Sequence, residues 1–319
     1  MIKDLPTAEQ FEQVALDLLN LAWTSAADLT HNLKLAREGW DDEAIDREIT
    51  DEYWSAAQRP LATATSLVQQ AMEFLLKARI TTVSPYLLLT DEWPRGCESR
   101  DAAFSEFKTI DANELIRVHN TVGTMRLDPA FIAFFNELRQ LRNTATHSLI
   151  ADRRFSEREV FVSILKTVSF LLLPKTWIDI RRAYLDRDPI AVTHSTDFSP
   201  ARLAQDITVA IDVMAPADTL TYFGFDKRAR AYCCPSCIRR CAEGELGVGE
   251  SEPRLAQLTE KNPECTHAKC ILCGRMIEVT REPCAHNGCP GNVIERYTRV
   301  CMTCNRYQPG SEPNFDCDY

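Results

Sequence analysis

Cysteine is concentrated at one end of this chain, and that concentration most constrains what the chain can fold into. Twelve of the thirteen cysteines lie between residues 233 and 317, and Cys97 is the exception. The N-terminal segment carries an early acidic residue, Asp4, and lacks the apolar stretch of a secretory signal. In a chain without an export signal, clustered cysteines indicate metal ligands, not disulfides. We therefore expect a cysteine-poor N-terminal part and a metal-stabilised C-terminal part.

The cysteine spacing predicts two metal sites with four ligands each. We assign the first site to Cys234, Cys237, Cys270 and Cys273, and the second to Cys284, Cys289, Cys301 and Cys304. A long inserted loop separates the two Cys pairs of the first set, and a short strand-like hairpin, GNVIERYTRV, joins those of the second. Both sets resemble zinc ribbons. Four thiolates fill the tetrahedral shell of Zn²⁺, which leaves no position for a substrate. The predicted cofactor is therefore structural Zn²⁺, with two ions per chain.

Spacing alone leaves some ligands open. Five further residues are candidates that could replace an assigned cysteine: Cys233, Cys241, Cys265, His267 and His286. The tail is poor in aliphatic residues, so we expect metal binding to supply much of its folding energy. Zinc ribbons bind RNA, bind proteins or cap a fold, and the residue pattern does not decide among these roles.

Before the cysteines, apolar residues recur at helical spacing, which predicts a mainly α chain. Helix boundaries are indicated by Pro60, by Asp128 followed by Pro129, and by Ser156 and Glu159 at capping-box spacing. The predicted architecture is a helical bundle followed by a small β-rich zinc-ribbon module. We expect an N-terminal helical extension at 1–58, the bundle at 59–175, a helical connector at 176–222 and the zinc-ribbon module, with two sites, at 223–319.

Charge and hydropathy exclude some functions. The net charge is −10, and residues 1–60 contain thirteen Asp or Glu against five Lys or Arg. Wrapping a long nucleic-acid duplex requires many cationic contacts, so that role is disfavoured, whereas a small site that cuts one phosphodiester is not. No run of about eighteen apolar residues is present. We expect a cytoplasmic protein without a membrane partner.

Two helical stretches carry a resemblance to a known family. The stretch LVQQAMEFLLKARI contains Glu73 and Lys77 in a Glu-x-x-x-Lys pattern, and FFNELRQLRNTATHS contains Arg142, Asn143 and His147. The first resembles the opening helix of HEPN domains. The second resembles their signature, in which a polar residue follows an Arg and a His comes a few positions later. The resemblance covers about residues 60–175 and implies a HEPN-like bundle of four or five helices.

The resemblance also implies an activity. Many HEPN proteins are metal-independent endoribonucleases of toxin–antitoxin, phage-defence or RNA-processing systems, and they commonly act as homodimers. Arg142 would hold the phosphate, and His147 would transfer protons at the 2′-OH or the leaving oxygen. Asn143 would orient the imidazole or the phosphate, and Glu73 would support these residues. The implied products carry 2′,3′-cyclic phosphate ends. RNA, a second copy of the chain, and a protein partner or antitoxin are the expected partners.

The same residues allow simpler interpretations. Arg and His in a last helical turn interact favourably with the free carbonyls there, and Glu73 could simply pair with Lys77 four residues on. The alternative is a non-catalytic, dimeric HEPN and zinc-ribbon protein that serves as a binding protein or an adaptor. Zinc-dependent hydrolysis is disfavoured, because no His-Glu-x-x-His pattern or deaminase-like motif is present.

Overall fold

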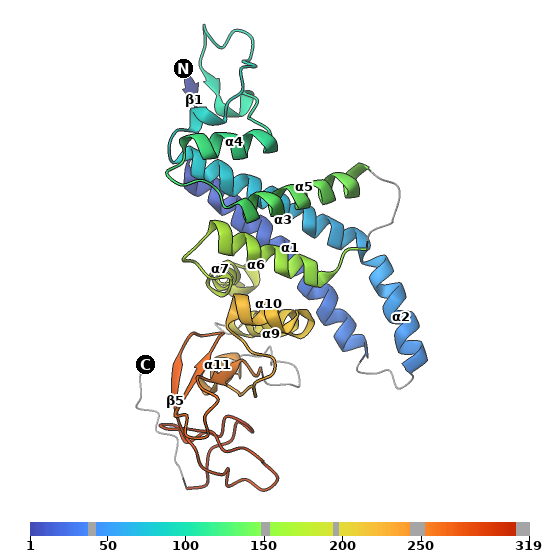
Figure 1. Cartoon of the computed structure of the whole chain (residues 1–319), viewed down its shortest axis with the longest axis vertical. Helices are drawn as coiled ribbons and strands as arrows, with labels where there is room; N and C mark the ends of the chain where they lie inside the picture. The colour runs from blue at the N-terminus through green and yellow to red at the C-terminus, as the bar shows by residue number, and fades with distance from the viewer. Residues whose placement is uncertain (38–42, 148–153, 194–197, 243–252, 311–319) are drawn as a thin grey trace. The chain divides into compact units, whose positions relative to one another are not determined.

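The structure is a computed structural model that describes residues 1–37, 43–147, 154–193, 198–242 and 253–310. The chain divides into two compact units, an N-terminal unit at 1–176 and a C-terminal unit at 177–319 (Figure 1). The predicted extension and bundle fall in the first unit, and the predicted connector and zinc-ribbon module fall in the second. The prediction of a mainly α chain with a small β-rich part is confirmed.

The N-terminal unit is a helical bundle built around one central helix. Its helices are α1 (Ala8–Arg37), α2 (Glu43–Ala56), α3 (Gln58–Thr81), α4 (Ala112–Val122), α5 (Pro129–His147) and α6 (Glu157–Leu171). Helix α3 contacts α1, α4, α5 and α6, and half of its residues are buried. Two short strands, β1 (Ile2–Lys3) and β2 (Ala102–Ala103), pair in parallel beside the bundle. Helix α3 therefore fixes the position of any site built on its neighbours.

Local sequence signals account for several helix ends. Helix α5 begins at Pro129, and the Asp128 carboxylate accepts a hydrogen bond from the Ala130 amide at 2.7 Å. Helix α6 begins after Ser156, whose hydroxyl and the Glu159 carboxylate form the predicted capping box. None of the helices in the described ranges is long and apolar enough to cross a membrane.

The C-terminal unit combines short helices with a small sheet. Its helices are α7 (Trp177–Leu185), α8 (Pro189–Thr193), α9 (Phe198–Val213), α10 (Pro216–Phe223) and α11 (Pro235–Ala242). Strands β3 (Ala256–Leu258), β4 (His267–Cys270), β5 (Met276–Thr280) and β6 (Ile294–Glu295) form an antiparallel sheet in sequence order. The Lys227 ammonium donates to three carbonyls at the end of α9, those of Ile211, Asp212 and Met214, at 2.8–3.0 Å. A cation there complements the helix dipole and attaches the following segment to α9.

A buried ion pair joins α7 to α9. The side chains of Arg181 and Asp206 are each 1% exposed, and both Nε and Nη2 of Arg181 lie 2.8 Å from Asp206 Oδ2. Arg202 donates from Nε to the other carboxylate oxygen at 2.9 Å. Because both oxygens are engaged, the desolvated charges are compensated by hydrogen bonds as well as by each other.

We predict that Asp206→Ala lowers the free energy of unfolding of the C-terminal unit by about 3–5 kcal/mol, because it removes the carboxylate that faces the buried charge of Arg181. The double variant Arg181→Met/Asp206→Leu should recover much of this loss, because no charge then remains buried at the pair. Urea unfolding of the metal-loaded protein, followed by circular dichroism, measures both. A single variant within about 1 kcal/mol of wild type would contradict the assignment.

Candidate functional site

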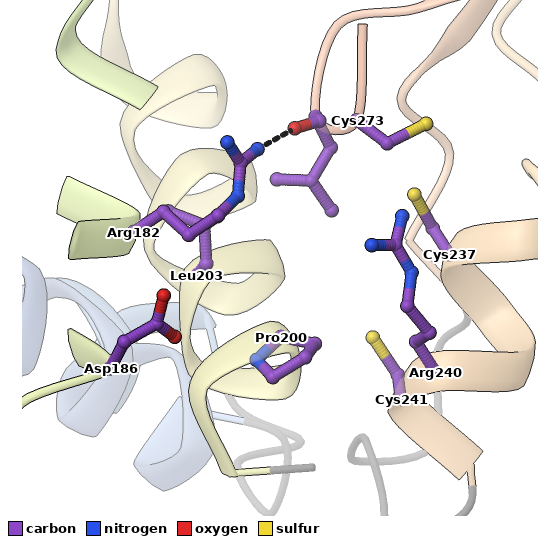
Figure 2. A pocket seen from close by; sticks show the side chains of 9 residues that line it. Arg182, Asp186, Pro200, Leu203, Cys237, Arg240, Cys241 and Cys273 are labelled. Atoms are coloured by element: carbon purple, nitrogen blue, oxygen red, sulfur yellow. Dashed lines mark hydrogen bonds between the residues drawn. The ribbon is translucent and has the colours of Figure 1, made fainter. Parts of the chain in front are cut away.

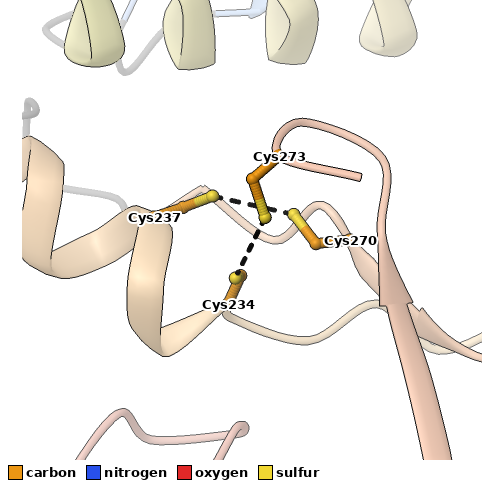
Figure 3. A group of neighbouring side chains, drawn as sticks. All are labelled: Cys234, Cys237, Cys270 and Cys273. Atoms are coloured by element: carbon orange, nitrogen blue, oxygen red, sulfur yellow. Dashed lines mark hydrogen bonds between the residues drawn. The ribbon is translucent and has the colours of Figure 1, made fainter. Parts of the chain in front are cut away.

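Four cysteines that are distant in sequence meet in the C-terminal unit (Figure 3). Cys234 immediately precedes α11, and Cys237 lies in the first turn of that helix. Cys270 is the last residue of β4, and Cys273 lies in the turn that leads to β5. Their sulfur atoms all lie within 4.8 Å of one another and converge on one point. A second group with the same spread of sulfur atoms contains Cys284, Cys289, Cys301 and Cys304.

The sulfur spacing fits a tetrahedral metal ion. In the first group, the Sγ atoms of Cys234 and Cys273 are 3.8 Å apart, and those of Cys237 and Cys270 are 3.7 Å apart. The corresponding distances in the second group are 3.8 and 3.9 Å. Four sulfurs at about 2.3 Å from Zn²⁺ form a tetrahedron with edges of about 3.8 Å, whereas a disulfide requires about 2.05 Å. Each group can therefore hold one metal ion, and each consists of the four cysteines predicted from the sequence.

The same turn geometry builds one half of each group. The amide of Gly274 donates to the Cys270 carbonyl at 2.9 Å, and the amide of Asn305 donates to the Cys301 carbonyl at 2.8 Å. Both donors follow the second cysteine of a Cys-x-x-Cys pair and have positive φ, +71° for Gly274 and +53° for Asn305. Glycine and asparagine tolerate this left-handed conformation better than other residues. The turn closes each pair so that its two sulfurs point the same way.

Crowding of the sulfur atoms shifts the pKa values of the thiols. Contacts with the sulfurs of Cys234 and Cys270 raise the pKa of Cys237 above its ordinary value. Burial raises the pKa of Cys284, but a hydrogen bond from Gln308 and a backbone hydrogen bond outweigh it, so the pKa falls to about 6. Ionising four thiols in so small a volume is unfavourable unless a cation offsets their repulsion.

The five open ligand candidates lie outside both groups. Cys233 and Cys241 are buried, and the Cys265 sulfur lies 3.2 Å from the His267 carbonyl and 3.4 Å from the Thr259 hydroxyl. The His267 ring contacts the Thr266 hydroxyl at 3.1 Å through Nδ1, and His286 Nε2 lies 2.6 Å from the Tyr307 carbonyl. Among the described residues, neither metal group therefore requires a histidine.

A pocket of about 220 Å³ lies beside the first group (Figure 2). Cys237 and Cys273 form part of its wall, and Arg182 of α7 and Arg240 of α11 also line it. Arg182 Nη2 donates to the Leu272 carbonyl at 2.5 Å, and Leu272 lies between two of the cysteines. The arginines place positive charge near the thiols, and the hydrogen bond attaches the ligand turn to helix α7.

The two groups are joined by the backbone. The Cys233 amide, next to the first group, donates to the Met302 carbonyl at 2.8 Å, and Met302 lies between two cysteines of the second group. Arg254 adds a hydrogen bond from Nη2 to the Thr303 carbonyl at 3.1 Å. The second group is also closely packed, because a Cβ at Gly291 would lie only 2.7 Å from the Thr303 side chain. The metal groups thus share one small structural core.

In the N-terminal unit, α3 and α5 bring Arg142 and Glu73 together. Arg142 Nη1 lies 3.7 Å from Glu73 Oε1 and donates to Gln69 Oε1 at 3.2 Å. Gln69, which is fully buried, donates from Nε2 to Glu73 Oε1 at 2.6 Å. One amide thus contacts both charged groups and holds them in register. The Arg142 side chain is 43% exposed, so it stays accessible from solvent.

The other residues of the motif are placed as follows. Asn143 is exposed on α5, and the helix ends at His147, whose side chain lies outside the described residues. Lys77 donates to the Thr109 hydroxyl at 3.4 Å. Burial lowers the pKa of Lys77, and the Glu73 carboxylate opposes that shift. Glu73 therefore contacts Arg142 of the signature helix and also acts on Lys77.

Sequence reasoning did not identify Gln69 or Gln308. Gln69 occupies a buried position of α3 four residues before Glu73, and a polar residue within an apolar stripe is the signal that could have marked it. Gln308 is 7% exposed and donates from Nε2 to the Cys284 sulfur at 3.5 Å, while its Oε1 accepts from the Ala285 amide. No spacing rule indicates Gln308, because its partners lie more than twenty residues earlier.

We predict that the purified chain binds about two Zn²⁺, and that Cys237→Ser and Cys289→Ser each remove about one. The matched controls Cys97→Ser and Cys265→Ser should retain both ions, because these sulfurs lie outside the groups. Elemental analysis of gel-filtered protein gives the metal-to-protein ratio. Loss of an ion from Cys265→Ser would show that the ligand assignment is wrong.

Comparison with known proteins finds no match to this chain among family models, curated proteins or solved structures. The resemblance to HEPN domains therefore stays a prediction from the signature residues. The chain is a two-unit protein that is mainly helical and has two tetracysteine groups able to bind metal.

Proposed function

We propose that this chain is a metal-independent endoribonuclease of the HEPN type, of the toxin, phage-defence or RNA-processing class, with two structural Zn²⁺ ions in its C-terminal unit. The observation that carries the proposal is the contact of Arg142 with Glu73 and Gln69. Two stretches chosen only for their signature residues come together across the bundle. An ordinary helix end would not require a buried amide to hold its arginine.

The residues support cleavage by the RNA's own 2′-hydroxyl. Attack of the 2′-oxygen on phosphorus forms the cyclic phosphate and breaks the bond to the 5′-oxygen. His147 accepts the 2′-OH proton, and a proton returns to the leaving 5′-oxygen. Arg142 stabilises the charge that builds on the phosphate, and its guanidinium is held by Gln69 and Glu73.

The helix geometry favours a dimeric site. Helix α5 continues to His147, and ideal helix geometry separates positions 142 and 147 by about 140° around the axis. Asn143 lies four residues before His147 and therefore on the same face. One phosphate can meet both Arg142 and His147 if two copies of the chain place their signature helices face to face. We therefore propose a homodimer with both copies contributing to the site.

The eight grouped cysteines are the proposed Zn²⁺ ligands. An all-thiolate tetrahedral shell suits Zn²⁺ and closes its coordination sphere. When bound, the ion supplies folding energy and rigidity to the C-terminal unit. RNA cleavage then depends on side chains of the N-terminal unit, and metal removal affects it only through the fold.

A non-catalytic binding protein is the second candidate. The observation that favours it is the 3.7 Å contact in which the Glu73 carboxylate offsets the Arg142 charge. The acidic net charge of −10 also suits a protein-binding adaptor. In that role, the signature helices would form a dimer interface, and the metal-binding unit would contact a partner.

We predict that wild-type protein cleaves mixed RNA in EDTA and leaves 2′,3′-cyclic phosphate ends. Arg142→Ala/His147→Ala should lower the rate by at least about 100-fold, because proton transfer and charge stabilisation are both lost. Arg126→Ala, an exposed arginine that precedes α5, is the matched control and should retain the wild-type rate.

End analysis of the fragments measures this, while circular dichroism and metal content verify that each variant stays folded and loaded. Equal cleavage by the double variant would exclude the proposed site. Absence of cleavage by folded wild-type dimer on every RNA tested would favour the binding protein.

A further inference from the structure

A second pocket, distinct from the metal groups, lies on the small sheet of the C-terminal unit. Its volume is about 630 Å³, and residues of β4, β5 and the segments flanking them line it. Arg281, which directly follows β5, lines this pocket together with Thr266, His267 and Thr280. The lining also contains Arg296 and the carboxylates of Glu264 and Glu278, so it combines hydrogen-bond donors with two acceptors.

Arg281 is an unusual arginine. Its Nε and Nη1 atoms are shielded from solvent and have no hydrogen-bond partner within the described part of the chain. Buried donors are almost always paired in folded proteins, and an unpaired charged donor is especially unfavourable. Because both atoms are shielded, the Arg281 side chain must turn toward the pocket to meet a ligand. An anionic oxygen, which a phosphate presents in matching geometry, would then complete its unsatisfied N–H groups.

The neighbouring charges do not satisfy Arg281. The Glu278 carboxylate is engaged by Arg296, with Nη1 and Oε2 2.9 Å apart. Glu264 also lines the pocket and, among the described residues, forms no ion pair. Two arginines and two glutamates line the pocket, and Arg296 and Glu278 offset each other. A phosphate bound at Arg281 would therefore be attracted by that guanidinium and repelled by the Glu264 carboxylate. That arrangement predicts opposite effects when each charge is removed.

The distribution of charge favours a polyanion in this part of the chain. Residues 223–242 and 253–310 contain thirteen Lys or Arg against six Asp or Glu, although the whole chain has a net charge of −10. Two Zn²⁺–thiolate centres would each carry a net charge of about −2, which still leaves a positive excess. A positive excess in one part of an acidic chain supports contact with a polyanion such as nucleic acid.

We propose that this pocket binds a backbone phosphate of single-stranded RNA and that Arg281 is its anion-binding residue. The choice of RNA over other polyanions rests on the proposed ribonuclease function. The site itself rests on the unsatisfied guanidinium and the pocket. Contact with a phosphate gives affinity without base readout, so the pocket would hold substrate without selecting its sequence.

The test measures binding apart from cleavage. Full-length, zinc-loaded protein carrying Arg142→Ala/His147→Ala is titrated into a fluorescein-labelled oligouridylate of about twelve nucleotides, and anisotropy gives Kd at several salt concentrations. Adding Arg281→Gln should raise Kd about 5- to 10-fold and reduce the salt slope by about 1. Glu264→Gln should lower Kd, because it removes the opposing charge.

Arg239→Gln is the matched control, since it removes one positive charge from the exposed face of α11, outside the pocket. Its Kd should stay within about twofold of the parent. If Arg239→Gln and Arg281→Gln raise the Kd for RNA equally, the proposed pocket is wrong and diffuse electrostatic attraction explains the binding. No RNA binding by the parent, or an unchanged Kd for Arg281→Gln with full metal content, would also overturn it.

The two proposals can fail separately. If RNA binds through Arg281 but the wild-type protein never cleaves RNA, the proposed RNA-binding pocket stands and the proposed ribonuclease function fails. If the wild-type protein cleaves RNA but Arg281→Gln leaves the Kd for RNA unchanged, the ribonuclease function stands and the proposed RNA-binding pocket fails.

Discussion

The distance between sulfur atoms is the constraint on which the C-terminal unit depends. Each group places four sulfurs at the edge length of a zinc tetrahedron, and the ligands come from segments more than thirty residues apart in the first group. The sheet, whose strands have two to five residues, and the eight-residue α11 offer little apolar surface to fold by burial alone. Local hydrogen bonds, such as Arg182 to the Leu272 carbonyl, orient the ligands, and a metal ion bound by the four sulfurs would then provide the crosslink.

The N-terminal unit depends on a different device, a buried amide. Gln69 is fully buried on α3, and its two polar atoms contact the Glu73 carboxylate and the Arg142 guanidinium. A buried polar side chain is tolerated only when its donors and acceptors are used. The amide therefore fixes which face of α5 meets α3, and the position of Arg142 follows from that packing. A salt bridge alone, at 3.7 Å, would define the geometry less sharply.

Features governed by local chemistry could be predicted from the sequence. The capping box at Ser156, the start of α5 after Asp128 and the membership of both cysteine groups depend on spacings of a few residues, or on repeated turns that present the same ligand pair. Ser199 shows the limit of that reasoning. It resembles a helix cap, yet α9 begins at Phe198, and the Ser199 hydroxyl donates to the Leu185 carbonyl at 3.1 Å.

Features governed by contacts distant in sequence could not be predicted. Trp23 of α1 packs against Phe161 of α6 with ring centroids 4.5 Å apart, which places the N-terminal helix in the bundle unit. The partner of Gln69 lies 73 residues away, and Arg281 becomes notable only when its neighbours are known. Periodicity shows which face of a helix is buried but not what covers it.

The hydrogen bond from the Cys233 amide to the Met302 carbonyl has a thermodynamic consequence. Ordering either ligand turn by a metal ion also restrains the other, so the ion that binds second meets a turn with less conformational freedom left to lose. Coupling of this kind is reciprocal, so each ion increases the affinity for the other by the same factor. Chains carrying a single ion would then be rarer than if the two sites bound metal independently. The C-terminal unit would lose its metal over a narrow range of free metal concentration.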